Sequence, residues 1–94
     1  MAISFTDRVN VPEGVLISGL QSESVILNLN SERYFGLDEV GTRMLSVLNE
    51  TESIQAAYDT LRQEYDVDDE VLRQDLISII EQLLEQGVVE ITRK

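Results

Sequence analysis

Three short hydrophobic runs in the first half of the chain have the composition of β-strands. They are Val15–Leu20, Ser24–Leu29 and Arg33–Leu37, and each contains β-branched or aromatic residues, which favour a pleated backbone. Two brief polar connections, Gln21–Glu23 and Asn30–Glu32, separate them. Sequential strands joined by such short links pair as antiparallel neighbours, so the pattern predicts a three-stranded meander.

The third run is the stretch that we expect a partner to use. Alternation directs Arg33, Phe35 and Leu37 to one face of the strand, and Tyr34 and Gly36 to the other. A glycine inside a strand often marks the close approach of another backbone. As the last strand of a meander, this run has one unpaired edge, and an apolar edge promotes aggregation unless it is covered or used. We therefore hypothesise that a peptide pairs with this edge.

Helical spacing of the hydrophobic residues begins directly after the third run. A first helix is predicted to start after Asp38, whose carboxylate can accept the free amides of the first turn. Thr51 or Ser53 caps a second helix, and a third runs from the acidic start at Asp68 to Gly87, a typical C′ glycine. The residues expected on the buried faces of the first two helices are Met44, Leu45, Val47, Leu48, Ile54, Ala57, Tyr58, Leu61 and Tyr65.

The third helix carries a hydrophobic arc that is broader than packing on one neighbour requires. Its central stripe is Leu72, Leu76, Ile79 and Leu83, with Ile77, Ile80 and Leu84 on one side and Val71 off the other. Two interpretations follow from this width. The helix is the central pillar of a small core, or one margin of its arc is exposed and lines a groove beside the third strand.

The chain as a whole is predicted to be a single α+β domain over residues 1–94, winged helix-turn-helix-like, with a three-stranded antiparallel sheet followed by three helices. We assign the sheet to residues 15–37, the helices to 38–87 and a short final strand to 88–92. An N-terminal arm, residues 1–14, has hydrophobic residues at alternate positions. It is either an extra strand or a packed arm.

The net charge of the chain limits the classes of molecule that it is expected to bind. The 94 residues include 18 acidic and 7 basic side chains, which gives a formal net charge of −11. Binding to nucleic acid or to an anionic membrane depends on cationic side chains, so both partners are disfavoured. A neutral or basic peptide, or a basic patch on another protein, fits this surface better.

The residue types that the chain lacks argue against several kinds of catalytic and metal site. The chain has no cysteine and no histidine, and therefore lacks a thiolate nucleophile, the commonest general base and the usual zinc ligands. We expect no catalytic residues, no metal site and no cofactor. No signal peptide or long apolar stretch is present, which favours the cytoplasm. A free strand edge can pair with its own copy, so we expect a monomer or a weak dimer.

An ordered series of motifs resembles a known family. The series is Leu27-Asn28-Leu29, Tyr34-Phe35-Gly36-Leu37-Asp38-Glu39-Val40-Gly41, Ile54 to Tyr65, Asp75-Leu76, Ile79, Leu83 and Gly87-Val88-Val89. It is similar to the pyrroloquinoline-quinone synthesis D (PqqD-like) family, the recognition elements of ribosomally made, post-translationally modified peptides (RiPPs). The run from Tyr34 to Gly41 looks most like the stand-alone recognition proteins of lasso-peptide pathways. The resemblance covers roughly residues 15–91.

This resemblance implies a function and a set of contact residues. A precursor leader peptide would bind as an added strand on residues 33–37, beside the third helix, and be delivered to a partner leader peptidase of the cysteine-protease type, with a cyclase as a further partner. The implied peptide-binding residues are Asn28, Arg33, Tyr34, Phe35, Gly36, Leu37, Asp75, Leu76, Ile79, Ile80 and Leu83. Quinone-pathway members share the third-helix pattern, so a peptide chaperone that serves a radical enzyme is the alternative. Asp75 either reads a polar group of the leader or is a solvated helix acid.

Three other functions are weaker. A winged-helix transcriptional regulator would need cations on its third helix, where Arg73 stands among Ser78, Glu81, Gln82 and Glu85. An acyl carrier protein would need a carrier serine, but Ser53 is better explained as a helix cap. An enzyme or a calcium site would need more than the acidic turn 66–70, which lacks both a base and the spacing of calcium ligands.

Overall fold

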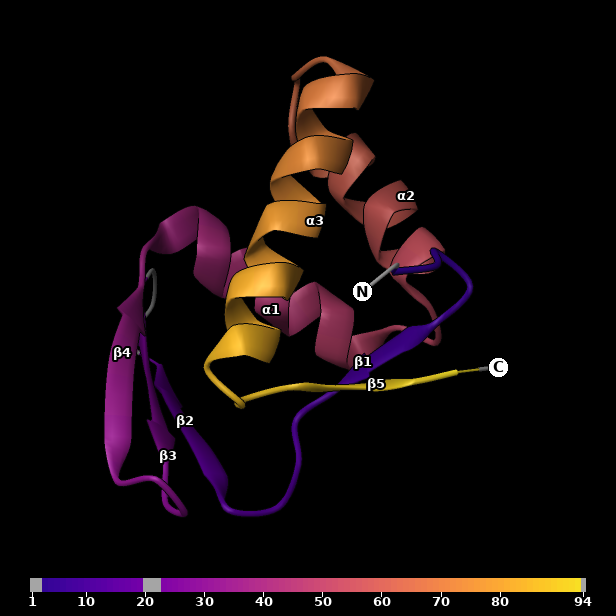
Figure 1. The fold of residues 1–94 in the computed structure, drawn as a ribbon. Helices are drawn as coiled ribbons and strands as arrows, with labels where there is room; N and C mark the ends of the chain where they lie inside the picture. Colours follow the sequence, from indigo (N-terminus) through magenta and orange to yellow (C-terminus); the bar gives the residue numbers. More distant parts are fainter. Residues whose placement is uncertain (1–2, 20–22, 94) are drawn as a thin grey trace.

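The chain folds into a three-stranded antiparallel sheet followed by three helices, with a second, smaller sheet formed by its two ends (Figure 1). The computed structural model describes residues 3–19 and 23–93. The elements, in chain order, are β1 (Arg8–Asn10), β2 (Val15–Gly19), β3 (Ser24–Asn28), β4 (Arg33–Leu37), α1 (Glu39–Glu50), α2 (Ile54–Glu64), α3 (Asp69–Glu85) and β5 (Glu90–Thr92). The predicted α+β class, with the sheet ahead of three helices, is confirmed.

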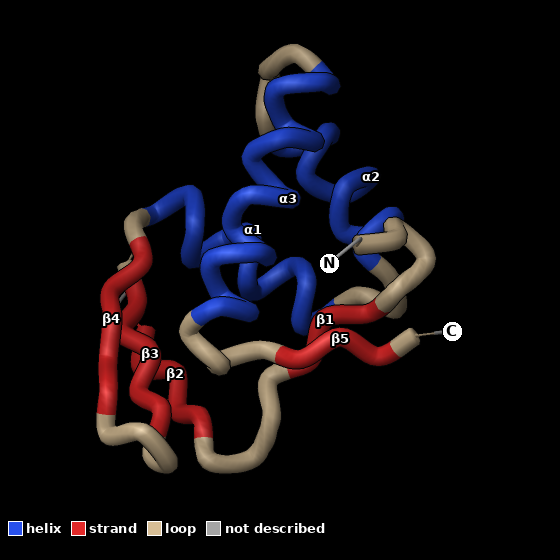
Figure 2. Tube along the Cα trace, viewed as in Figure 1, coloured by secondary structure: helices blue, strands red, loops and turns tan. Residues whose placement is uncertain are grey.

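The larger sheet has the order β2-β3-β4. Its predicted third strand, Arg33–Leu37, has the same bounds in the structure. The second strand is one residue shorter than predicted and ends at Asn28. The predicted turn between the first two strands lies partly outside the described residues, because these omit 20–22. Figure 2 shows the three strands together on one side of the helices.

The core side of this sheet carries two polar residues. Ile26 is buried between Ile17 and Phe35, its partners in the register, while Ser24 and Asn28 point inward with it. Both polar side chains are satisfied, since the Ser24 hydroxyl lies 2.8 Å from Thr42 Oγ1 and Asn28 Nδ2 donates to the Gly87 carbonyl. The more apolar face of β3 therefore points to solvent.

The N-terminal arm is both a strand and a packed segment. Residues 8–10 form β1 and pair antiparallel with β5, so that Val9 lies opposite Ile91. Upstream of β1, the Phe5 ring meets the Tyr58 ring edge to face, with centroids 5.9 Å apart. The Arg73 guanidinium lies 4.4 Å from the Phe5 centroid. The arm thus covers one flank of α3 as well as the start of α2.

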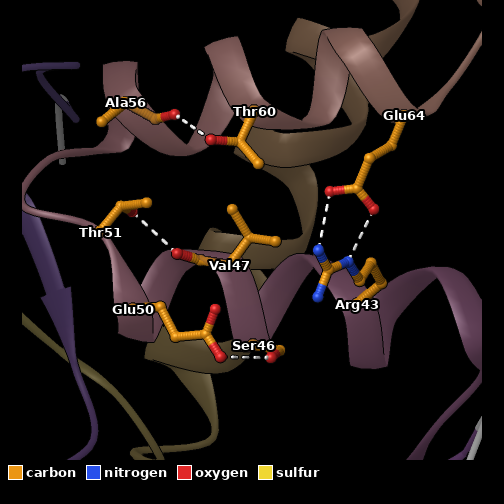
Figure 3. Close-up of polar contacts among 8 residues, drawn as sticks. All are labelled: Arg43, Ser46, Val47, Glu50, Thr51, Ala56, Thr60 and Glu64. Atoms are coloured by element: carbon orange, nitrogen blue, oxygen red, sulfur yellow. Dashed lines mark hydrogen bonds and ion pairs between the residues drawn. The ribbon is translucent and has the colours of Figure 1, made fainter.

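The helix ends follow from side-chain caps. Asp38 and Ser53 accept backbone N–H groups of the first turns of α1 and α2, at 2.8 and 3.1 Å. Thr51, the other candidate cap of α2, instead ends α1, because its hydroxyl donates to the Val47 carbonyl (Figure 3). Helix α3 ends at Glu85 and is closed by Gly87, which has a φ of +72° and is followed by an N–H···O bond from Val88 to Leu83. This arrangement is a Schellman cap, which favours glycine at that position.

The centre of the core is the buried stripe of α3. Leu72, Leu76, Ile80 and Leu83 are all buried and pack with residues of α1, α2, β3 and the terminal strands. The pillar interpretation is therefore right for the middle of the helix. Among the described helices, none combines the length and the hydrophobicity that crossing a bilayer would need.

An ion pair joins α1 to α2 on the surface. Arg43 Nε and Nη2 donate to the two carboxylate oxygens of Glu64, each at 2.8 Å (Figure 3). The hydrogen bond from Arg43 lowers the pKa of the Glu64 carboxyl, and the bond to Glu64 raises the pKa of Arg43. Because Glu64 titrates at lower pH when folded, the pair contributes stability above the usual glutamate pKa, and this contribution is lost as the pH falls through the lowered value.

Glu64→Gln is therefore expected to reduce stability slightly at neutral pH and to flatten the loss of stability in acid. The effect is small because the pair is exposed to water, and salt screens it further. Thermal unfolding of both proteins at neutral and acidic pH checks this. A difference in melting temperature that is the same at every pH would mean that the pair does not titrate as described.

Candidate peptide-binding site

The outer edge of β4 is free of any backbone partner. Within the part of the chain that the structure describes, β4 pairs only with β3. Successive residues of a strand direct their N–H and C=O groups to opposite edges, so alternate residues of Arg33–Leu37 present unpaired groups outward. The edge expected from the sequence therefore exists.

The side chains of β4 differ in exposure. Arg33, Tyr34 and Gly36 are exposed, and Tyr34 is exposed to 75% although it is aromatic. Phe35 is half-buried and packs against the core, and Leu37 is buried. A Cβ added at Gly36 would meet only the Ser24 carbonyl oxygen, at 3.8 Å. Nothing within the described chain therefore requires a glycine there, and the close approach of another backbone at Gly36 stays a prediction.

Helix α3 approaches the sheet at its C-terminal end. The hydrogen bond from Asn28 to the Gly87 carbonyl joins β3, the neighbour of β4, to the end of this helix. Asn28 also accepts the backbone N–H of Asn30, at 3.0 Å, which shapes the turn into β4. Asn28 is buried, so the structure assigns this predicted contact residue a supporting role.

The predicted residues of α3 divide into two groups. Leu76, Ile80 and Leu83 are fully buried in the core, so they do not reach the surface where a peptide would lie. Ile79 is half-buried and Asp75, one turn before it, is exposed. The sequence placed all five on one face because they share an arc of the helix, but only the margin with Asp75 and Ile79 is accessible.

Two exposed valines were not among the predicted contact residues. Val40 is exposed to 45% in the first turn of α1, immediately after β4, and Val71 is exposed to 51% in the first turn of α3. The hydrophobic pattern places Val71 off the central stripe of the helix, but it does not indicate that Val71 belongs to a binding site. Both are apolar side chains accessible on α1 and α3, the helices that follow β4 and carry Ile79.

We use the name edge strip for two sets of residues taken together, the β4 edge and the accessible margin of α3, whose elements are linked through the Asn28–Gly87 hydrogen bond. Its members are Arg33, Tyr34, Phe35, Gly36, Asp75 and Ile79. It combines unpaired backbone groups, half-buried apolar side chains and one acid. Such a surface suits an extended peptide, which would add main-chain hydrogen bonds along β4 and place alternate side chains against Phe35 and Ile79.

Comparison with known proteins identifies the family. Residues 23–89 match the sequence profile of the family described as coenzyme PQQ synthesis protein D (PqqD). The chain belongs to the PqqD family. The matched region runs from the residue before β3 to the residue before β5 and so contains every residue of the edge strip. Among curated proteins, none matches the chain.

Two solved structures share the fold of this PqqD-family chain. One, TbiB1 in complex with the TbiA(beta) leader peptide, is 31% identical, with a TM-score of 0.80 over 86% of this chain and 94% of that one. The other, a lasso peptide synthetase B1 complexed with the leader peptide, is 18% identical, with a TM-score of 0.78 over 88% and 98%. Both comparisons span most of either chain and confirm the fold.

Three arginines of this PqqD-family chain are engaged by side chains outside the edge strip. Arg43 and Arg62 form ion pairs with Glu64 and Asp69, and Arg73 lies over Phe5. On the strip itself, Arg33 is the one cation, and no donor among the described residues bonds the Asp75 carboxylate. Asp75 is thus available to a donor on a bound peptide.

Proposed function

We propose that this chain is the recognition element of a RiPP pathway, and that it binds the leader peptide of a lasso-peptide precursor on the edge strip. The observation that carries the proposal is the unpaired edge of β4 in a PqqD-family fold. The 31% identical relative, which was solved with a leader peptide, supports the class of ligand.

Binding would proceed by strand addition. The leader aligns with Arg33–Leu37 and supplies partners for the outward N–H and C=O groups, each bond contributing about 1 kcal/mol net. Main-chain bonds are insensitive to sequence, so selectivity has to come from side chains. Apolar leader residues that cover Phe35 and Ile79 would add roughly 1.5–3 kcal/mol each when fully buried.

The role of the chain would be to bind and present, with the chemistry supplied by other proteins. A sequence without cysteine or histidine has few candidates for a nucleophile or a general base. In this proposal a cysteine protease removes the leader and a cyclase closes the product, and the recognition element holds the leader in an extended form for them. An extended leader bound at one edge keeps the rest of the precursor free to reach these enzymes.

A second candidate is a quinone-cofactor pathway, in which the same edge strip would hold a precursor for a radical enzyme. The description of the matched family favours it. The two candidates share the binding mode and differ in the peptide. A DNA-binding role is disfavoured by the net charge of −11 and by the acids on the exposed face of α3.

Fluorescence anisotropy with labelled leader peptides tests the proposal. We expect saturable binding, with a dissociation constant of about 10 μM or less, for the leader of a lasso precursor encoded beside this chain. A scrambled leader of the same composition is the control. Binding of a quinone-type precursor alone would select the second candidate, and no anisotropy change with either peptide at tens of micromolar protein would refute leader recognition.

A further inference from the structure

The larger sheet has a second free edge, on β2. Within residues 3–19 and 23–93, β2 pairs only with β3, as β4 does on the other side. None of its five residues is charged, and Leu16 and Ile17 are exposed to 54% and 42%. Soluble proteins usually protect such edges with charged residues, proline or a bulge. Strand β4 carries Arg33, whereas β2 contains neither a charged residue nor a proline.

A pocket of about 320 Å³ lies beside this edge, between the sheet and α1. Its lining residues are Ile17, Gly19, Ser24, Thr42, Leu45, Ser46 and Asn49. The Thr42 hydroxyl lies between Ser24 Oγ, at 2.8 Å, and the Leu37 carbonyl, at 3.3 Å, which ties the floor of the pocket together. Engineered apolar cavities of roughly 150 Å³ hold benzene, so this pocket can receive an aliphatic side chain.

The surroundings of the pocket are acidic. Glu50 accepts a hydrogen bond from Ser46 Oγ, at 3.4 Å, on the helix wall of the pocket (Figure 3). Glu23 directly precedes Ser24 at the pocket end of β2, whereas Glu13 precedes the opposite end of this strand by two residues. Among the described residues, those that line the pocket itself are all uncharged, so the carboxylates act from its surroundings. A second copy of this chain would bring the same carboxylates against these, which makes self-pairing unfavourable.

We propose that β2 is a second strand-addition edge, which takes an extended segment of a partner protein with an apolar side chain in this pocket and lysine or arginine residues at its ends. Main-chain bonds to β2 supply the alignment, the pocket selects the side chain, and the carboxylates of Glu13, Glu23 and Glu50 select the charge. This edge is on the opposite side of the sheet from the edge strip, so both edges can be occupied at once. A partner could then dock without displacing a peptide from β4.

A nuclear magnetic resonance titration of the whole chain tests this. The probe is a short synthetic peptide of alternating valine and threonine flanked by lysines, and the matched control peptide carries glutamates instead. We expect saturable shifts of the β2 amides and of Ser46 and Asn49 with the lysine peptide, and roughly tenfold weaker binding of the glutamate peptide. Shifts confined to β4 and α3, equal binding of both peptides, or no saturation at millimolar peptide would overturn the proposal.

Three variants complete the test. We expect Ile17→Lys to lower the affinity for the lysine peptide by roughly tenfold or more, and Ser46→Arg, on the helix wall, to do the same. Leader binding at β4 is expected to stay unchanged in both variants. Val67→Lys adds the same charge at a residue exposed to 49%, in the turn between α2 and α3, and is expected to have no effect on the peptide. An equal loss of affinity for the lysine peptide in Val67→Lys would show that the added charge, and not its position in the pocket, weakens binding. Concentration-dependent shifts of β2 without peptide would assign this edge to a second copy and also overturn the proposal.

Discussion

Ile79→Asp is expected to weaken leader binding by about two orders of magnitude while the chain stays folded. Ile79 is half-buried at the accessible margin of α3, where a leader side chain would cover it. The substitution removes an apolar contact worth roughly 1.5–3 kcal/mol, and a covered carboxylate adds a desolvation cost. Together about 3 kcal/mol is lost, which corresponds to a factor of roughly 100 in the dissociation constant.

The control is Ile77→Asp, on the same helix and also half-buried, although of the two only Ile79 packs against the core. Ile77 lies about 200° around the helix from Ile79. It shares its flank with Arg73, whose guanidinium lies over the ring of Phe5 in the N-terminal arm. Anisotropy with the labelled leader, together with circular dichroism, compares the two variants. If both variants stay folded and lose the same affinity for the leader, the leader does not contact the Ile79 margin of α3.

Leu76→Ala is expected to lower the free energy of unfolding by about 2–5 kcal/mol. Leu76 is fully buried in the middle of the α3 stripe, so truncation leaves a cavity that its rigid neighbours cannot close. Domains of this size are stable by only about 5–15 kcal/mol, so the shift in a urea midpoint would be large. Leader affinity of the remaining folded protein is expected to stay the same.

Val71→Ala is the control for this second prediction. Val71 lies on the same helix but is exposed to 51%, so its truncation is expected to change stability by less than about 0.5 kcal/mol. Should Leu76→Ala leave the urea midpoint where it is and abolish leader binding, the buried stripe would belong to the site and the division of α3 described above would be incorrect.

Local signals explain why much of the fold was predictable. Strand β4 has the predicted bounds because alternation and turn residues act over a few positions. The caps Asp38 and Ser53 bond amides three residues away, so their effect is visible in the sequence. The pairing of β1 with β5 joins Arg8 to Thr92, and no local pattern records which distant strands meet.

The candidate site was predictable in part for the same reason. Helical spacing places Leu76 and Ile79 on one arc, but it does not say which neighbour covers which margin. The core covers Leu76, and the N-terminal arm covers the flank of Arg73, so the margin of Ile79 is what stays accessible. Asn28 was expected to touch a peptide, but its amide is used by Gly87 and Asn30 within the fold.

The second free edge shows a further limit of sequence reasoning. A meander predicts two edge strands, but the aromatic residues and the family motif that indicate a binding edge lie on β4. The pocket beside β2 is formed by residues from β2, β3 and α1, such as Ile17, Ser24 and Ser46, which come together only in the folded chain. Its chemistry could therefore be described only from the structure.

Amide hydrogen exchange of β4, measured with and without the leader peptide, tests strand addition most directly. Outward N–H groups of Arg33–Leu37 have no backbone partner within residues 3–19 and 23–93, so they should exchange readily, while the inward ones are bonded to β3. The account predicts that saturating leader slows exchange at alternate residues of β4 and leaves β2 unchanged. Binding of the leader with no added protection along β4, or with protection only along β2, would contradict it.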